Sequence, residues 1–228
     1  MNYFYSKNIS KDFIFLEGQE MIHCTTVLRK KVDDVVIVVD GLGGIFHCKI
    51  LKIHSDKCDL KIINKDRLDR KQDIHLIISP TKNHKRIDWM IEKIVEIGIY
   101  RVTFMICSNS IRQKINLDRL NKIALSAMKQ TQNAFLPIID NCLPFSKIFD
   151  IVDSKEKYIA HLNNKDTIHL HSTIKGHKKR CILIGPEGDF TKEEVEYSIN
   201  KGFEEVSLGI SRLRTETSGI VAATILNL

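Results

Sequence analysis

The chain has 228 residues, of which 43% are hydrophobic and 28% are charged, and its formal net charge is +7. This length is enough for one large domain or two small ones with a real hydrophobic core, and the composition is that of a soluble globular protein. No stretch approaches the roughly 18 uninterrupted apolar residues of a membrane helix. Residues 1–15, MNYFYSKNISKDFIF, lack the pattern of a signal peptide. We therefore predict a cytoplasmic protein without a membrane segment.

The positive net charge favours a polyanionic partner such as nucleic acid, because lysine and arginine side chains neutralise phosphates. A lysine-rich surface that is merely solvated would give the same charge. Composition alone leaves these two interpretations open.

A metal site is not indicated. The six cysteines form no C-x-x-C pair and mostly lie in apolar runs, where reduced cysteine behaves as a small hydrophobe. His169 and His171 are two residues apart, but no third ligand lies near them in the sequence. We predict that the protein holds no structural or catalytic metal.

Residues 1–72 have the pattern of short β-strands. VVIVV at 35–39 and GIFHCKILKI at 44–53 flank a glycine-rich turn, and CDLKII at 58–63 follows with alternating polar and apolar residues. The N-terminal NYFYS is compatible with a further strand. Several short strands separated by turns predict a small β-barrel.

Three consecutive cations, Arg29, Lys30 and Lys31, follow an apolar segment of this region. A cationic rim on a small barrel suits contact with phosphates. A solvated run of charges has the same appearance in the sequence.

The charged stretch NKDRLDRKQD at 64–73 separates two patterns, so we place domains at 1–72 and 73–228. Beyond it, apolar runs alternate with segments of helical periodicity, which predicts an α/β fold with a parallel sheet. Gly98 is the expected C-cap of the first helix, and Thr191 with Glu194 forms a capping box at the start of a later one. The predicted strands are 74–79, 102–107, 157–162, 181–184 and 206–209, and the predicted helices are 87–97, 117–128, 191–199 and 217–227.

Three of these strands end in loops with unusual residues. The loops cover 161–164 (HLNN), 185–189 (GPEGD) and 208–217 (LGISRLRTET). Ligands of open parallel sheets bind at the carboxyl ends of the strands, so three such loops that converge would form a pocket. The chain has no G-x-G-x-x-G, no G-x-x-x-x-G-K-[ST] and no G-x-S-x-G, which gives no support to a dinucleotide site, a P-loop or a nucleophile elbow.

Three charged residues of these loops have two interpretations each. Glu187 in the glycine loop suits a general base, but loop glutamates are more often solvated or capping. Arg214 and Glu216 suit a catalytic pair near a helix start. They equally suit a salt bridge, with Thr215 or Thr217 capping the helix.

Two segments near the C-terminus resemble the paired motifs of the SPOUT methyltransferases, and more narrowly those of the RsmE family. They are IGPEGDFTKEEVE (184–196) and SLGISRLRTETSGIVAA (207–223). Residues 22–50, 82–99 and 127–137 also resemble segments of that family, so the likeness covers nearly the whole chain.

The resemblance implies a PUA-like β-barrel that binds RNA, followed by a SPOUT domain with a deep trefoil knot. It implies methylation of nitrogen 3 of a uridine in 16S ribosomal RNA, with S-adenosylmethionine as cofactor. The partners would be 16S rRNA or the small ribosomal subunit, and a second copy in a homodimer with active sites at the interface.

The same resemblance assigns roles to individual residues. Arg214 would stabilise the developing imide anion, and Glu216 or Glu187 would accept the proton. The RNA contacts would be Arg29, Lys30, Lys31, Lys82, Lys85 and Arg86. The cofactor would be held by His161, Leu162, Ile184, Gly185, Pro186, Glu187, Gly188, Leu208, Gly209, Leu213, Arg214 and Thr217.

Five positions depart from the pattern of the family, of which the mildest is Ser218 in place of the usual alanine. Asp189 stands where glycine is usual, Asn109 where arginine is common, and Lys129 and Asn133 where glutamate and arginine are usual. Two rival functions remain open. One is a SPOUT enzyme that acts on a ribose 2′-hydroxyl or on tRNA, and the other is a non-catalytic RNA-binding factor of ribosome assembly.

Overall fold

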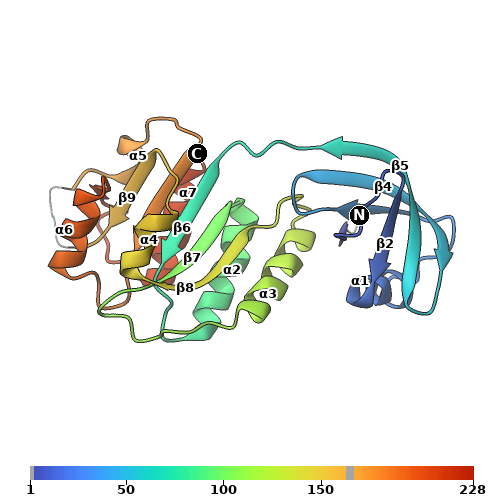
Figure 1. Ribbon diagram of the computed structural model, residues 1–228, viewed down its shortest axis with the longest axis horizontal. Coiled ribbons are helices and arrows are strands. Elements are labelled where there is room, and N and C mark those ends of the chain that lie inside the picture. Colours follow the sequence, from blue (N-terminus) through green and yellow to red (C-terminus); the bar gives the residue numbers. More distant parts are fainter. Residues whose placement is uncertain (1–2, 163–166) are drawn as a thin grey trace. The chain divides into compact units, whose positions relative to one another are not determined.

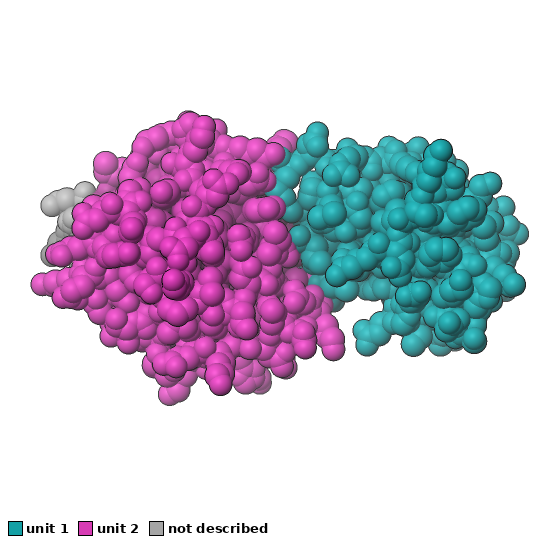
Figure 2. All heavy atoms as spheres, in the orientation of Figure 1, with its two compact units in different colours: residues 1–70, 125–136 teal, residues 71–124, 137–228 magenta. Residues whose placement is uncertain are grey.

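The protein is described by a computed structural model that covers residues 3–162 and 167–228. The chain forms two compact units, which Figure 2 shows in different colours. The N-terminal unit contains residues 1–70 and 125–136, and the C-terminal unit contains 71–124 and 137–228. The chain first passes from the N-terminal to the C-terminal unit after residue 70, close to the boundary predicted after residue 72. No feature of the sequence indicated that residues 125–136 belong to the N-terminal unit.

The N-terminal unit is a five-stranded sheet in the order β1-β3-β4-β5-β2. β1 pairs with β3 in parallel, and the other pairs are antiparallel. The strands are β1 (Tyr3–Tyr5), β2 (Phe13–Glu17), β3 (Val35–Val39), β4 (Gly44–Ile53) and β5 (Lys57–Arg67), and between β2 and β3 lie helix α1 (Gly18–Ile22) and the π-helical turn η1 (His23–Val27).

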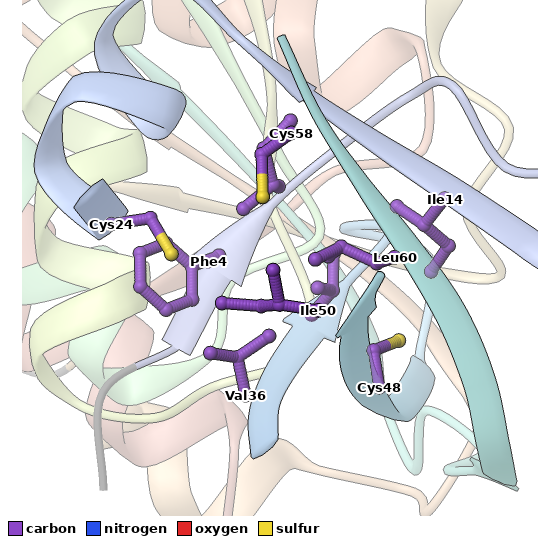
Figure 3. Packing of buried hydrophobic residues seen from close by; sticks show 10 residues of the cluster. Phe4, Ile14, Cys24, Val36, Cys48, Ile50, Cys58 and Leu60 are labelled. Carbon is purple, nitrogen blue, oxygen red and sulfur yellow. The ribbon is translucent and has the colours of Figure 1, made fainter. Parts of the chain in front are cut away.

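This sheet curls around a core of buried side chains, as expected for a PUA-like fold (Figure 3). Phe4, Ile14 and Leu60 come from three different strands, and Cys24 reaches the core from η1. Register shifts between β4 and β5 mark bulges, which increase twist and bend a sheet. The strands β3 and β4 have their predicted bounds, but β2 and the helical segment before residue 28 were not predicted.

The C-terminal unit is built on six parallel strands in the order β11-β9-β10-β6-β7-β8 (Figure 1). This confirms the predicted α/β fold with a parallel sheet. The strands are β6 (Asp73–Ile78), β7 (Arg101–Ile106), β8 (Ile138–Pro144), β9 (Glu156–Ala160), β10 (Lys179–Ile184) and β11 (Glu204–Val206). Its helices are α2 (His84–Ile97), α4 (Phe145–Ile151), α5 (Leu170–Thr173), α6 (Lys192–Asn200) and α7 (Thr215–Leu226). Helix α3 (Leu117–Gln130) begins in this unit, and its residues from 125 onward belong to the N-terminal unit.

Local signals located most of these elements but not all of them. Gly98 ends α2 in the left-handed conformation, and Thr191 and Glu194 form the expected capping box of α6. The predicted strand at 206–209 was misplaced, because β11 ends at Val206 and the next residues already belong to a loop. β8, α4 and α5 were missed.

Helix α7 packs against one face of the parallel sheet and against α2. A Cβ atom on Gly219 would lie 2.8 Å from Cδ1 of Ile78 and 3.2 Å from Sδ of Met90, so glycine sets the distance between the helix, the sheet and α2. The opposite face is covered by α4 and α6, whose Ile148 and Val195 belong to one cluster with residues of the strands. The apolar final helix is therefore a sheet-packed helix.

The last turn of α7 is held by a buried arginine at the start of β10. Arg180 is 3% exposed, and its Nη1 donates to the carbonyl oxygen of Leu226 at 2.6 Å. Its Nε lies 3.8 Å from Glu156, whose carboxylate also accepts hydrogen bonds from the hydroxyl of Tyr158 and from two backbone N–H groups. A cation at the C-terminus of a helix satisfies free carbonyls and complements the helix dipole.

We predict that Gly219→Val lowers the free energy of unfolding by about 2–3 kcal/mol, because the added carbons overpack a filled core. Urea denaturation would measure it. Thr224→Val is the matched control, since Thr224 is exposed on the same helix. Equal midpoints for the two variants would show that α7 does not approach the sheet this closely.

A second prediction concerns pH. Burial, together with the nearby Arg101 guanidinium, lowers the pKa of His75 to about 4, and Nε2 of His75 lies 2.7 Å from the Thr103 hydroxyl. The folded state favours the neutral ring, so its contribution to stability is complete above the unfolded pKa near 6.5 and is lost as the pH falls toward 4.

Between pH 7 and pH 4 the wild type should therefore lose about 3 kcal/mol more than His75→Gln, whose side chain keeps a polar contact but does not titrate. Denaturation at several pH values would show this difference. Parallel pH curves for the two proteins would contradict the assignment.

Candidate active site

The three predicted loops follow three neighbouring strands. β9 lies between β10 and β11, and Ala160 at the end of β9 is in register with Ile184 of β10 and with Val206 of β11. Because the three strands are parallel, their carboxyl ends lie at one edge of the sheet and at one level. The predicted convergence of the loops is confirmed.

The loops enclose a cavity of about 340 Å³, a size typical of small-ligand sites. Ten of the predicted cofactor residues line it: His161, Leu162, Ile184, Gly185, Pro186, Glu187, Leu208, Gly209, Leu213 and Arg214. Gly188, Glu216 and Thr217 are not among the lining residues. Asn163 and Asn164, which the sequence placed in the first loop, lie outside the described residues.

The glycines of the GPEGD loop are explained by contacts within the chain. A Cβ on Gly185 would lie 3.0 Å from the ring of Phe190, and a Cβ on Gly188 would lie 3.2 Å from Cβ of Asn109. At Gly209 no atom lies within 4 Å of such a Cβ, but the backbone has φ +132°, which L side chains rarely adopt. Side chains at Gly185 and Gly188 would therefore crowd neighbours in the chain itself, and a side chain at Gly209 would be strained.

The two carboxylate oxygens of Glu187 differ in their hydrogen bonding. The Oε1 atom of Glu187 accepts a hydrogen bond from the backbone N–H of Lys82 at 2.8 Å. The Oε2 atom of Glu187 is buried, and no hydrogen-bond donor within the described residues reaches it. A carboxylate oxygen without a protein donor at the wall of a cavity can accept a hydrogen bond from a bound group.

Glu216 lies in the first turn of α7 and is only 4% exposed. Its Oε1 is 3.5 Å from Nε of Arg86, a residue that lines the cavity. The sequence suggested Arg214 as the salt-bridge partner and RNA phosphate as the partner of Arg86, so this pair was not anticipated. The alternative of a threonine cap is wrong, because the N-cap is Arg214 and no side chain caps the helix.

The predicted RNA-contacting residues fall on both units. Arg29 and Lys31 are exposed in the turn after η1, and Lys82 and Lys85 are exposed around the start of α2.

Within residues 3–162 and 167–228, no group of three or more His, Cys, Asp or Glu side chains is arranged to hold a metal ion. In the same part of the chain, no helix has the length and apolar character needed to cross a bilayer.

Two family models match this chain. One, described as an RNA methyltransferase domain, matches residues 69–227, and the other, described as an RNA methyltransferase PUA domain, matches residues 16–63. The ribosomal RNA small subunit methyltransferase E of Buchnera aphidicola (subspecies Acyrthosiphon pisum) is 30% identical over 226 residues, which are 94% of this chain and 87% of the relative. The chain belongs to the RsmE family of RNA methyltransferases. The resemblance drawn from the two C-terminal motifs is thereby confirmed.

Solved structures agree with the RsmE assignment. The "probable rRNA-methyltransferase" of Porphyromonas gingivalis is 35% identical with a TM-score of 0.90, and 98% of this chain covers 95% of that one. A ribosomal RNA small subunit methyltransferase E from Neisseria gonorrhoeae, bound to S-adenosyl methionine, is 26% identical with a TM-score of 0.85 and the same coverage. The predicted α/β fold with a parallel sheet and a preceding PUA-like unit is confirmed.

Two departures of this RsmE member contact each other at the GPEGD loop, and of the two only Asp189 lines the cavity. Asp189 has φ +62°, a left-handed conformation that glycine adopts freely and aspartate tolerates. Its Oδ2 accepts the N–H of Leu162 at 3.0 Å, which ties the loop after β9 to the loop after β10. Nδ2 of Asn109 donates to the carbonyl oxygens of Gly188 and Asp189. Asp189 thus adds a link that glycine cannot make.

A third departure has a structural explanation in the N-terminal unit. Lys129 forms an ion pair with Glu20 of α1, and the other carboxylate oxygen of Glu20 accepts a hydrogen bond from the N–H of Tyr5 at 3.1 Å.

Several residues that line the cavity were not assigned to the cofactor from the sequence. They are Arg86, Ala160, Asp189, Val206, Ser207, Ser211, Arg212, Thr215 and Ser218. Most of them flank the motif residues, so proximity in sequence was the available signal.

We predict that Asp189→Ala lowers the free energy of unfolding by about 2 kcal/mol, through backbone strain and loss of a hydrogen bond to Leu162. Asp189→Asn should stay close to the wild type, since asparagine tolerates the same backbone and keeps one acceptor. Urea denaturation of both variants would test this, and equal stability of the two would refute the link.

Proposed function

We propose that this protein transfers a methyl group from S-adenosylmethionine to nitrogen 3 of a uridine in 16S ribosomal RNA. The observation that carries the proposal is the cavity between the GPEGD loop and the LGISRLRTET loop in a chain of the RsmE family. The relatives are named for methylation of small-subunit ribosomal RNA, and the relative from N. gonorrhoeae was crystallised with S-adenosyl methionine.

The residues of the cavity fit this cofactor. When bound, S-adenosylmethionine supplies a methyl group activated by a positively charged sulfonium. Leu162, Leu208 and Leu213 offer apolar surface suited to an adenine ring, and the free Oε2 of Glu187 suits a cationic or hydrogen-bond-donating part of the ligand. The main task of the protein is to position donor and acceptor.

Arg214 is the residue we assign to the chemistry. The N–H at N3 of uracil must lose its proton before the nitrogen becomes nucleophilic, which leaves negative charge on the imide. Arg214 is exposed at the cavity and immediately precedes the first turn of α7, where the partial positive charge of the helix dipole lies. Because arginine stays charged at physiological pH, its role is electrostatic.

Of the two carboxylates considered as proton acceptors, the arrangement favours Glu187. Each has one buried oxygen that no donor of the described residues reaches, but Glu187 lines the cavity, whereas Glu216 does not and lies beside Arg86. In this proposal Glu216 positions the guanidinium of Arg86. The target uridine has to be unpaired or flipped out, because pairing would hide its N3 edge.

The proposal includes further properties that the family membership supports. They are a deep trefoil knot in the C-terminal unit, a homodimer with sites at the subunit interface, and a PUA-like unit at 1–72 that binds RNA through Arg29, Lys30 and Lys31. Lys82, which precedes α2, and Lys85, in its first turn, would add phosphate contacts. An enzyme of ribosome maturation would work in the cytoplasm.

Incubation with labelled S-adenosylmethionine and small ribosomal subunits, followed by mapping of the label, tests the function. Label on N3 of a uridine in 16S rRNA would establish it. Label on a ribose 2′-hydroxyl or on tRNA would show instead a SPOUT enzyme with another target. RNA binding without any label would show a non-catalytic factor of ribosome assembly.

We predict that Arg214→Ala lowers kcat by about 10²–10³, since it removes charge stabilisation from the transition state, while the Kd of S-adenosylmethionine changes little. Arg212→Ala is the matched control, because Arg212 is also exposed and lines the same cavity. Steady-state kinetics and calorimetry separate the two effects. An equal loss of kcat and cofactor affinity would show that Arg214 only binds the cofactor.

A further inference from the structure

A second hollow surface lies next to the cofactor cavity in the C-terminal unit. It consists of two adjoining hollows of about 400 and 440 Å³, which share Arg112 and Lys114. One side is the loop after β7, from Ile111 to Asn116, and the other is the start of α2 with Lys82 before it. We refer to this surface as the basic groove. Its other lining residues are His84, Ile87, Asp88, Gln113, Ile115, Arg119 and Leu120.

The groove and the cofactor cavity share a wall. The backbone N–H of Lys82 donates to Glu187, so the segment before α2 contacts the GPEGD loop directly. On its other side, Arg112 donates from Nε and Nη2 to the carbonyl oxygen of Lys82, and from Nε to that of Thr81. These contacts fix the position of Lys82 between the two sites.

The charge of the groove is strongly positive. Its lining contains four cationic side chains and one carboxylate, Asp88. Arg119 is paired with Asp88, and Arg112 is engaged with backbone carbonyls. Lys82 and Lys114 are exposed, and neither forms an ion pair with a residue in the described ranges. Beside them, the apolar side chain of Ile111 is 64% exposed.

We propose that the basic groove binds the RNA strand next to the target uridine, with phosphates on Lys82 and Lys114 and a base against Ile111. A single strand offers phosphates and apolar base faces in alternation, which matches exposed cations beside an exposed isoleucine. The strand at the target has to be unpaired in any case. The inference rests on the proposed function, since it places the RNA relative to the cofactor cavity.

The test uses the full-length protein and a labelled single-stranded RNA of about 12 nucleotides, with fluorescence anisotropy at several salt concentrations. Lys82→Gln combined with Lys114→Gln removes both proposed contacts. Lys155→Gln combined with Lys178→Gln is the control, because it removes the same charge from two exposed lysines before β9 and β10, at the opposite edge of the sheet.

For the groove variant, the slope of log Kd against log salt should fall by about 1.4, and Kd at 0.1 M salt should rise on the order of tenfold. The control should keep the wild-type slope. Calorimetry should show an unchanged Kd for S-adenosylmethionine in both variants, because the backbone contact of Lys82 with Glu187 remains.

Equal slopes for the groove variant and the control would overturn the proposal. It would also be overturned if the groove variant bound free RNA normally but bound assembled small subunits more weakly, since the groove would then contact a protein. A wild type that transfers no methyl group, together with a reduced slope in the groove variant, would reject the proposed function and keep the groove as an RNA site.

Discussion

The parallel pairing of β9 with β10 on one side and β11 on the other is the constraint on which the site depends. It aligns Ala160, Ile184 and Val206 at the same level, so that three loops distant in sequence leave the sheet together. Hydrogen bonds between backbones set this register. The central strand β10 packs against α7 on one face and against the cluster with Ile148 of α4 and Val195 of α6 on the other. A shift by one residue would turn buried side chains to the wrong face, and the packing therefore opposes it.

The loops are held in shape by the chain itself. Phe190 fills the space beside Gly185, Asn109 holds the carbonyl oxygens at the end of the GPEGD loop, and Asp189 binds the loop after β9. Such pre-organisation lowers the entropic penalty of binding a small, flexible ligand. The glycines of the GPEGD loop, which first suggest space for a cofactor, also keep a close approach between Gly185 and Phe190 and between Gly188 and Asn109.

Helix α7 connects the core to the chemistry. Gly219 sets how closely its middle approaches the sheet, and Arg180 holds its last carbonyl groups, so its first turn has a defined position. That turn carries Glu216, which pairs with Arg86, and directly before it stands Arg214. One helix, held by the core at Gly219 and at its last turn, thus helps to place two cations at the cavity.

The sequence by itself determined the element types, the parallel sheet, the three loops and the family, because hydrophobic periodicity, caps and the GPEGD and LRTET motifs are local features. It missed β8, α4 and the short strand β2, where local periodicity is weak. Only the tertiary structure decided that Glu216 pairs with Arg86, that Lys129 pairs with Glu20 and that Asp189 binds Leu162. These partners are tens of residues or more apart in the chain, and a contact of that kind depends on how the strands are ordered and paired, which no local pattern encodes.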